Sequence, residues 1–140
     1  MSFVAYLGLN YPIENVRFHN ESSVKITERY STQESSAAVL QHHLTTMYIV
    51  EIELERSLDD LNPQSKIETP VDYSEARQTL YAIIQFLRLN LQVGDYAQIY
   101  YCWTGEEAED SLGMATVLLS ELPIPDILTE ERFLITFIND

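Results

Sequence analysis

Three histidines are the side chains of this chain best suited to acid–base or metal chemistry. His42 and His43 are adjacent, so on a strand they face opposite sides and on a helix they diverge by about 100°. His19 begins the triplet His19-Asn20-Glu21, which fits the H-x-E half of a zinc deaminase site, but that site also needs several cysteine ligands. We therefore expect no metal site and no histidine-based active site.

Cys102 is the single cysteine, and its neighbours in the chain are Tyr101 and Trp103. A thiol becomes an effective nucleophile when a base or a cation lowers its pKa from about 8.5. The segment around Cys102 contains no basic residue, so we expect Cys102 to be a core side chain. A single cysteine also excludes an intrachain disulfide and any cysteine-cluster metal site, which makes a reducing, cytoplasmic location the simpler assumption.

Glycine-based motifs are missing from the sequence. The four glycines are too far apart to form a phosphate-binding loop, and there is no G-x-S-x-G segment. We therefore expect neither enzymatic activity nor a bound cofactor. The first ten residues contain no Lys or Arg, unlike a secretory signal, and no segment is apolar for long enough to cross a bilayer.

Acidic residues dominate the charge of the chain. Asp and Glu number 22 against eight Lys and Arg, which gives a net charge of -14. The surplus is largest in residues 95–140, which contain ten acids and only Arg132 as a cation. Such a charge repels nucleic-acid phosphates and anionic membranes, and it speeds association with a positive partner. We therefore expect a basic protein partner and no direct binding to nucleic acid or membrane.

A cluster of four acids beside a tryptophan is the first candidate for a partner-binding surface. Its residues are Trp103, Glu106, Glu107, Glu109 and Asp110. The alternative is a solvated loop whose carboxylates only keep the protein soluble. The spacing does not match the EF-hand pattern, so calcium has no specific support.

A second acidic row consists of Glu51, Glu53 and Glu55, which alternate with apolar residues. On a strand these three carboxylates share one face and lie about 7 Å apart. If a neighbouring strand pairs with this one, Lys25 and Arg29 can lie opposite the row and neutralise part of it. If the row is free, its spacing is near twice the ~3.4 Å rise per phosphate of one DNA strand, which would suit a nucleic-acid mimic.

Tyrosine accounts for nine of the fifteen aromatic residues. Tyr96 and Tyr100 share one face of the segment 96–103, and tyrosine offers a large contact area with a polar end, which suits protein interfaces. We include both in the candidate partner-binding surface. Packing of these rings within the sheet is the structural alternative.

Hydropathy patterns predict the elements that position these residues. Alternating or short apolar runs indicate strands, and apolar residues at every third or fourth position indicate a helix. The expected strands are 3–9, 24–30, 47–56, 96–103 and 133–138, with a long helix over about 70–92 and a loop over 57–70.

Two segments leave alternatives open. Residues 31–44 fit a short helix, with Ser31 and Glu34 as a capping box, or a further strand. Residues 114–122 fit either strand or helix. The long helix has clearer signals, because Thr69 can cap it, Pro70 suits its first turn and Gly94 suits its end.

The order of strands, long helix and strands predicts an α+β fold. We expect a single domain over residues 1–140, with a mainly antiparallel sheet of about five strands packed against the helix of about 70–92. Since 96–103 is apolar on both faces, it is expected to be a central strand.

These features favour a small acidic protein-interaction module that docks on a basic protein. Inhibitor and immunity-type proteins have similar size and charge, which is an analogy of class without a residue motif. The first alternative is a small ligand-binding domain or enzyme with a pocket between helix and sheet, where histidines and carboxylates would converge. The second is a structural subunit of a homo-oligomer, joined through the C-terminal strand or the helix flank.

Overall fold

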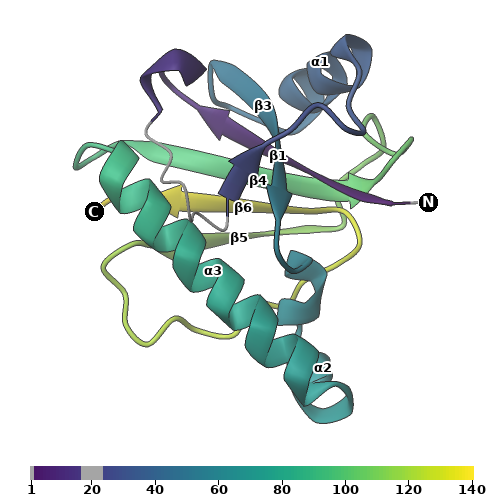
Figure 1. The fold of residues 1–140 in the computed structure, drawn as a ribbon, viewed down its shortest axis with the longest axis vertical. Coiled ribbons are helices and arrows are strands. Elements are labelled where there is room, and N and C mark those ends of the chain that lie inside the picture. The colour runs from purple at the N-terminus through teal and green to yellow at the C-terminus, as the bar shows by residue number, and fades with distance from the viewer. Residues whose placement is uncertain (1, 17–23) are drawn as a thin grey trace.

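A mixed sheet of six strands forms the centre of the computed structural model, which describes residues 2–16 and 24–140 (Figure 1). The strands are β1 (Phe3–Leu9), β2 (Val24–Ile26), β3 (Tyr48–Leu54), β4 (Tyr96–Trp103), β5 (Gly113–Leu118) and β6 (Phe133–Ile138). Their order across the sheet is β2-β3-β1-β4-β6-β5. All neighbouring pairs are antiparallel except β5 and β6, which are parallel. The predicted α+β class is confirmed, with one strand more than expected.

The central strand β4 has the bounds that the sequence predicts. It pairs with β1 on one side and β6 on the other. Ile99 and Tyr101 lie in the larger hydrophobic cluster on one face of the sheet, whereas Tyr100 and Cys102 lie in a smaller cluster on the other face. A strand with apolar residues on both faces is stable only when both faces are covered, which explains its central place.

The long helix α3 (Pro70–Asn90) crosses one face of the sheet (Figure 1). Pro70 lies in its first turn, as the sequence predicts, and Thr69 is at the N-cap position. The Thr69 side chain makes no capping hydrogen bond, because its hydroxyl donates to the carbonyl oxygen of Ser65 in the preceding helix. Leu80, Ile83 and Leu87 are almost fully buried, because apolar residues at this spacing form one stripe toward the sheet. The helix ends at Asn90, two residues before the predicted end.

Gly94 lies in the turn between α3 and β4. Its φ of +92° is in a region that favours glycine, and its N–H donates to the carbonyl oxygen of Asn139 at 2.7 Å. The glycine therefore shapes the turn after the helix, and Leu91 is the C-cap residue of α3.

The opposite face of the sheet is covered in part by the short helix α1 (Gln33–His42). Val39 of this helix packs with Val4, Tyr6 and Tyr100. A helix in 31–44 is therefore confirmed, but its capping box is formed by Thr32 and Ser35 rather than by Ser31 and Glu34. A box with Ser31 as N-cap would start the helix at Thr32, whereas α1 starts one residue later, at Gln33.

Three other segments differ from the sequence-based expectation. The strand predicted over 24–30 ends at Ile26, because the chain bends at residues 29 and 30, whose neighbouring backbone N–H groups, those of residues 30 and 31, donate to the Glu51 carboxylate of β3. The loop predicted over 57–70 contains a 3₁₀ helix, η2 (Leu58–Leu61), and a short helix, α2 (Pro63–Glu68). Residues 114–122 begin as the strand β5 and leave it after Leu118.

The helices of the described residues include none that is both long enough and apolar enough to cross a membrane. A second 3₁₀ helix, η1 (Ile13–Asn15), follows β1 and completes the set of elements in Figure 1.

Gly8 provides a test of the packing between β1 and the segment before β3. A methyl group at Gly8 would collide with the Thr46 hydroxyl oxygen and lie 2.9 Å from Cδ1 of Leu44. We expect Gly8→Ala to lower the free energy of unfolding by about 2 kcal/mol, as overpacked cores do, in urea denaturation. Adding Thr46→Ala should recover most of this loss, because it removes the colliding hydroxyl oxygen. The nearest remaining atom of residue 46 is then its Cβ, at 3.3 Å from the new methyl group at residue 8. Equal stability of the single and double variants would contradict this packing.

Candidate functional site

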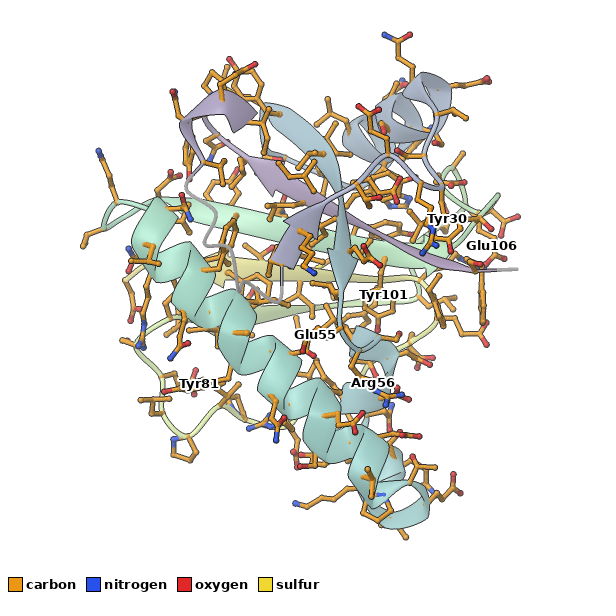
Figure 2. The ribbon with its side chains drawn as sticks, in the orientation of Figure 1. Tyr30, Glu55, Arg56, Tyr81, Tyr101 and Glu106 are labelled. Carbon is orange, nitrogen blue, oxygen red and sulfur yellow. The ribbon has the colours of Figure 1, made fainter. Side chains whose placement is uncertain are left out.

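The acidic loop 104–112 lies at the end of the sheet where β4 ends and β6 begins. Glu106 projects there beside the start of β1 (Figure 2), and Thr104 N–H donates to the carbonyl oxygen of Ser2 at 2.8 Å. Because β4 and β6 are antiparallel neighbours, the same end also holds the segment 129–132 that leads into β6. The topology thus brings together acids that are more than 20 residues apart.

Arg132 neutralises part of this loop. One of its terminal nitrogens, Nη1, lies 3.3 Å from a carboxylate oxygen of Glu106 and 3.2 Å from one of Glu109, and its Nε–H donates to the carbonyl oxygen of Asp110 at 2.8 Å. The side chain of Arg132 is only 18% exposed, so the contacts are partly shielded from water. The sequence suggests a loop of free carboxylates, but two of them, Glu106 and Glu109, are paired with Arg132.

Glu107 is an internal anchor of the same loop. It is 7% exposed, and its carboxylate accepts hydrogen bonds from the Tyr6 hydroxyl at 3.3 Å and from the Gly105 N–H at 2.9 Å. Its carbonyl oxygen lies 2.8 Å from Nε2 of His43, whose ring stacks on Tyr100 with centroids 3.9 Å apart. The inclusion of Glu107 and Tyr100 in an outer surface must be corrected, because sheet and α1 enclose both.

The row of Glu51, Glu53 and Glu55 does not form one exposed surface. Glu51 is 3% exposed, and its carboxylate accepts the backbone N–H groups of residues 30 and 31. Glu53 lies opposite Lys25 across the strand pair and 3.9 Å from Arg29. The prediction is thus confirmed for Lys25, whereas Arg29 lies beyond the end of β2 and approaches Glu53 from the segment that follows it. Glu55 is exposed and lies beyond β3.

The aromatic candidates lie at opposite ends of β4. Trp103 is half-buried and stacks on Phe3 with ring centroids 3.9 Å apart. Tyr96 lies seven residues earlier, roughly 23 Å away along a strand, and its hydroxyl is 2.9 Å from that of Thr45. Trp103 and Tyr96 are therefore too far apart to lie together at the centre of one compact interface.

Four carboxylates that the sequence analysis did not select lie beside this end of the sheet. Asp59 and Asp60 belong to η2, and Glu130 and Glu131 precede β6. We call these four residues the acidic end. Two hydrogen bonds hold the segments together: Thr129 Oγ1 donates to the carbonyl oxygen of Asp59, and Asn62 Nδ2 to that of Thr129, each at 2.9 Å.

The four carboxylates of the acidic end form no ion pair with any cation of the described residues. Burial raises the pKa of Asp59, and the charges of Asp60, Glu131 and Glu130 raise it further. Burial also raises the pKa of Asp60, with an added contribution from Asp72 that Arg56 partly offsets. The like charges are therefore close enough to repel one another.

Arg56, the cation that acts on Asp60, is engaged elsewhere. It forms ion pairs with Asp72 at 3.5 Å and with Glu75, both in the first turns of α3. No sequence motif marks the acidic end. The pair Asp59 and Asp60 is about 70 residues from the pair Glu130 and Glu131, and only the folded chain brings the two pairs together.

Burial governs the protonation of His43 and Cys102. Burial lowers the pKa of His43, and burial raises the pKa of the Cys102 thiol to about 12, so the thiol stays protonated at neutral pH. Among the described residues, no three side chains of the His, Cys, Asp and Glu types are placed to hold a metal ion. His19 and the triplet that it begins lie outside the described residues.

Similarity searches add no relative to these observations: no protein-family model, no curated protein and no solved structure matches the chain.

Proposed function

We propose that this protein is a small acidic protein-interaction module that docks on a basic protein, in the manner of an inhibitor. The observation that carries the proposal is the acidic end, where Asp59, Asp60, Glu130 and Glu131 gather without a cation partner among the described residues. Such a group of like charges costs stability in the free protein. A positive partner surface would relieve the repulsion.

The surroundings of the acidic end extend the same electrostatic field. The loop 104–112 contributes Asp110, whose carboxylate forms no ion pair with a described cation, and Glu109, which stays 57% exposed beside Arg132. A negative surface of this kind accelerates encounter with a positive protein and repels polyanions. It therefore supports a basic protein rather than a nucleic acid as partner.

A structural subunit is the second candidate function, and one observation favours it. β5 is an edge strand, and residues 111–120 contain no charged side chain, although the chain as a whole carries -14. Met114 on this strand is 74% exposed. Pairing of two β5 edges would join copies of the chain where their charges repel least.

Salt-dependent capture tests the proposed function. Immobilised protein is expected to retain a basic protein from a lysate of the cells that make it and to release that protein above about 0.3 M salt, where the Debye length falls to roughly 6 Å. The partner is then identified by mass spectrometry, and the purified pair must reproduce the salt dependence. Partners of neutral or acidic charge, or binding that salt does not weaken, would count against the proposal.

A further inference from the structure

The outer side of the strand β5 has no partner strand among the described residues. β5 lies at one end of the strand order and pairs with β6 alone (Figure 1). The two strands follow each other residue by residue from Gly113 to Leu118, without a bulge. The free side of such a strand carries a row of unpaired N–H and C=O groups, to which a further strand can add.

The register of β5 on β6 shows which backbone groups face outward. The N–H of the residue that follows β5 donates to the carbonyl oxygen of Ile138 on β6, at 2.9 Å. Because successive residues of a strand direct their backbone groups to opposite sides, those of Met114, Thr116 and Leu118 face away from β6. The Leu118 carbonyl oxygen accepts the Glu121 N–H at 3.1 Å. The other outward groups of these three residues make no hydrogen bond with the described residues.

The side chains of the same three residues form an exposed, uncharged patch. Met114 is 74% exposed and Leu118 is 37% exposed, and Thr116 is exposed as well. Val117 points to the other face of the sheet, where it belongs to the hydrophobic cluster that contains the buried residues of α3. The edge of β5 therefore presents backbone groups and apolar side chains together.

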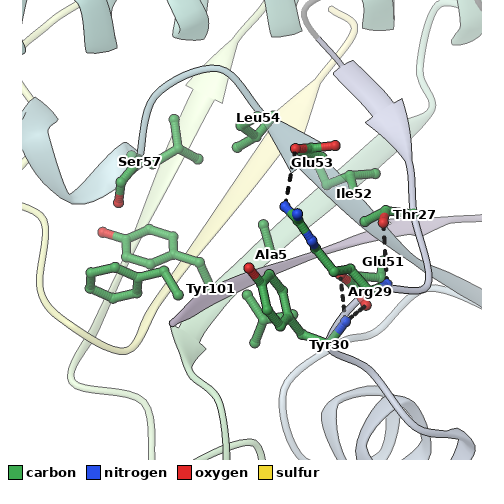
Figure 3. Close-up of a pocket in the computed structure, with 13 residues that line it drawn as sticks. Ala5, Thr27, Arg29, Tyr30, Glu51, Ile52, Glu53, Leu54, Ser57 and Tyr101 are labelled. Carbon is green, nitrogen blue, oxygen red and sulfur yellow. Dashed lines mark hydrogen bonds and ion pairs between the residues drawn. The ribbon is translucent and has the colours of Figure 1, made fainter. Parts of the chain in front are cut away.

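The opposite edge of the sheet is protected by charge and by its shortness. β2 has only three residues, and Lys25 in this strand is exposed. Figure 3 shows the segment that follows, in which Arg29 reaches Glu53 of β3 at 3.9 Å. Residues 111–120 contain neither a charged side chain nor a proline. Charges, prolines and bulges are the usual protection of a free edge, so the edge of β5 is open to strand addition.

The distribution of charge indicates what adds to this edge. An uncharged strand offers a basic partner no electrostatic attraction, whereas the chain has many carboxylates elsewhere. Two copies of a chain with a net charge of -14 repel each other at most of their surfaces. They can approach closely where neither copy carries charge, and β5 meets this condition on both sides of the contact. A second copy of the chain therefore fits the edge.

We propose that two copies of this protein pair through β5, antiparallel and about a twofold axis. Residues with outward backbone groups exchange hydrogen bonds, and the register with the most such pairs places Thr116 opposite Thr116 of the second copy. Met114 then lies opposite Leu118 of the second copy, and by symmetry this contact occurs twice. The two six-stranded sheets join into one continuous sheet. This inference rests on the second candidate function, the structural subunit, and adds the register and the residue at the axis.

Two single cysteine variants test the register. In the proposed dimer the two Cα atoms of residue 116 are about 5.5 Å apart, which suits a disulfide, so Thr116→Cys should form a covalent dimer with oxidised glutathione. Met114→Cys is the matched control, because its two copies are offset by four residues, or about 13 Å along the strands. Cys102 is fully buried in both variants. Non-reducing electrophoresis measures the products, and equal amounts of covalent dimer would overturn the proposed register.

Two charge variants test the edge itself. Met114→Glu places a carboxylate against Leu118 of the second copy at two symmetric contacts, so it should weaken dimerisation about tenfold. Leu128→Glu adds the same charge outside β5 at a residue of matching exposure, 73%, and should weaken dimerisation less than about twofold. Sedimentation velocity over a range of concentrations measures both. Equal losses would mean that only the total charge matters, and the edge would have no special role.

Salt acts on this dimer and on a complex with a basic protein in opposite directions. An increase in ionic strength from about 0.01 M to about 0.1 M shortens the Debye length from about 30 Å to about 10 Å. Because the copies carry like charge, dimerisation should become severalfold stronger over this range. Binding of a basic protein weakens instead. A dimer that salt dissociates would contradict pairing through an uncharged edge.

The outcomes separate this inference from the proposed functions. A protein that stays monomeric at about 1 mM would overturn the dimer, and salt-sensitive capture of a basic protein would then still support the acidic module. A dimer that Met114→Glu does not weaken would keep the structural subunit and remove β5 as its contact. A monomer that loses capture of the basic protein in Met114→Glu, but not in Leu128→Glu, would assign the edge to a strand of that protein and overturn the second copy as its occupant.

Discussion

Neutralising the acidic end is expected to weaken binding of an arginine-rich peptide about 100-fold at low salt. The variant combines Asp59→Asn, Asp60→Asn, Glu130→Gln and Glu131→Gln, each nearly isosteric with the residue it replaces. Isothermal titration calorimetry or fluorescence anisotropy would measure the affinity at several salt concentrations. The difference between variant and wild type should shrink as salt screens the charges.

The size of this effect follows from simple electrostatics. Two unit charges about 4 Å apart in water interact by about 1 kcal/mol, and measured pairs at exposed sites contribute about 0.2–1 kcal/mol. Four such contributions give about 2.7 kcal/mol, which corresponds to 100-fold in affinity. The four carboxylates form no ion pair with a cation of the described residues, so the peptide need not displace an internal partner to reach them.

The same variant should be slightly more stable than the wild type at neutral pH. The pKa values of Asp59 and Asp60 are raised in the folded protein, so their ionised forms destabilise the fold. This penalty is fully present above the folded-state pKa values and has disappeared below 3.8, the ordinary value, where both states are protonated. The advantage of the variant in urea denaturation should therefore shrink as the pH falls through that range.

A control variant with the same change in net charge tests the location of the effect. Glu14, Glu28, Glu34 and Glu121 are all exposed and lie outside the acidic end. Their replacement by Gln should weaken peptide binding only a few-fold, since distant charges are screened. If both fourfold variants lose affinity equally, the peptide senses only the total charge, and the acidic end has no special role.

Leu87→Ala is expected to lower the free energy of unfolding by about 3–4 kcal/mol. Leu87 lies in α3 and is fully buried against the sheet, with 0% exposure. Replacing a buried Leu by Ala removes its transfer free energy and leaves a cavity, for a total of 2–5 kcal/mol. Since small domains are stabilised by only about 5–15 kcal/mol, one such change removes a large part of the total.

Leu89→Ala is the matched control for this prediction. Leu89 lies two residues further along the same helix and is 54% exposed. The substitution has the same chemistry and the same change in helix propensity, so we expect less than about 0.5 kcal/mol. Urea denaturation followed by circular dichroism measures both. Equal losses at the two positions would show that α3 presents a different face to the sheet.

Strong local patterns made part of the fold predictable. The strands 96–103 and 133–138 have the bounds that the sequence predicts, and the helix differs by two residues at its end. The helix shows one stripe of apolar residues that matches its buried face, and both strands are short apolar runs that are buried on both faces. Residues 57–70 lacked such a run. The buried Leu58 and Leu61 both belong to η2, and α2 has no buried residue, so neither short helix shows an apolar period that a sequence pattern can indicate.

The candidate site was less predictable, because its contacts join distant parts of the chain. The sequence placed Glu106, Glu107 and Glu109 in one acidic loop, but it could not show that Arg132 pairs with two of them. It also could not show that Tyr6, 101 residues away, holds Glu107. Local composition measures how many charges a segment carries, whereas their availability depends on which side chains the fold brings alongside.

The sequence by itself determined that this protein is strongly acidic, that it forms an α+β fold with a long amphipathic helix, and that it lacks the known glycine and cysteine motifs. These properties depend on composition and on short-range periodicity, which a linear chain displays directly. Only the tertiary structure decided which carboxylates are buried, which are paired, and which gather at the acidic end. That choice depends on strand order and on contacts across the sheet, because Coulomb energies and burial depend on distances in space rather than on separation along the chain.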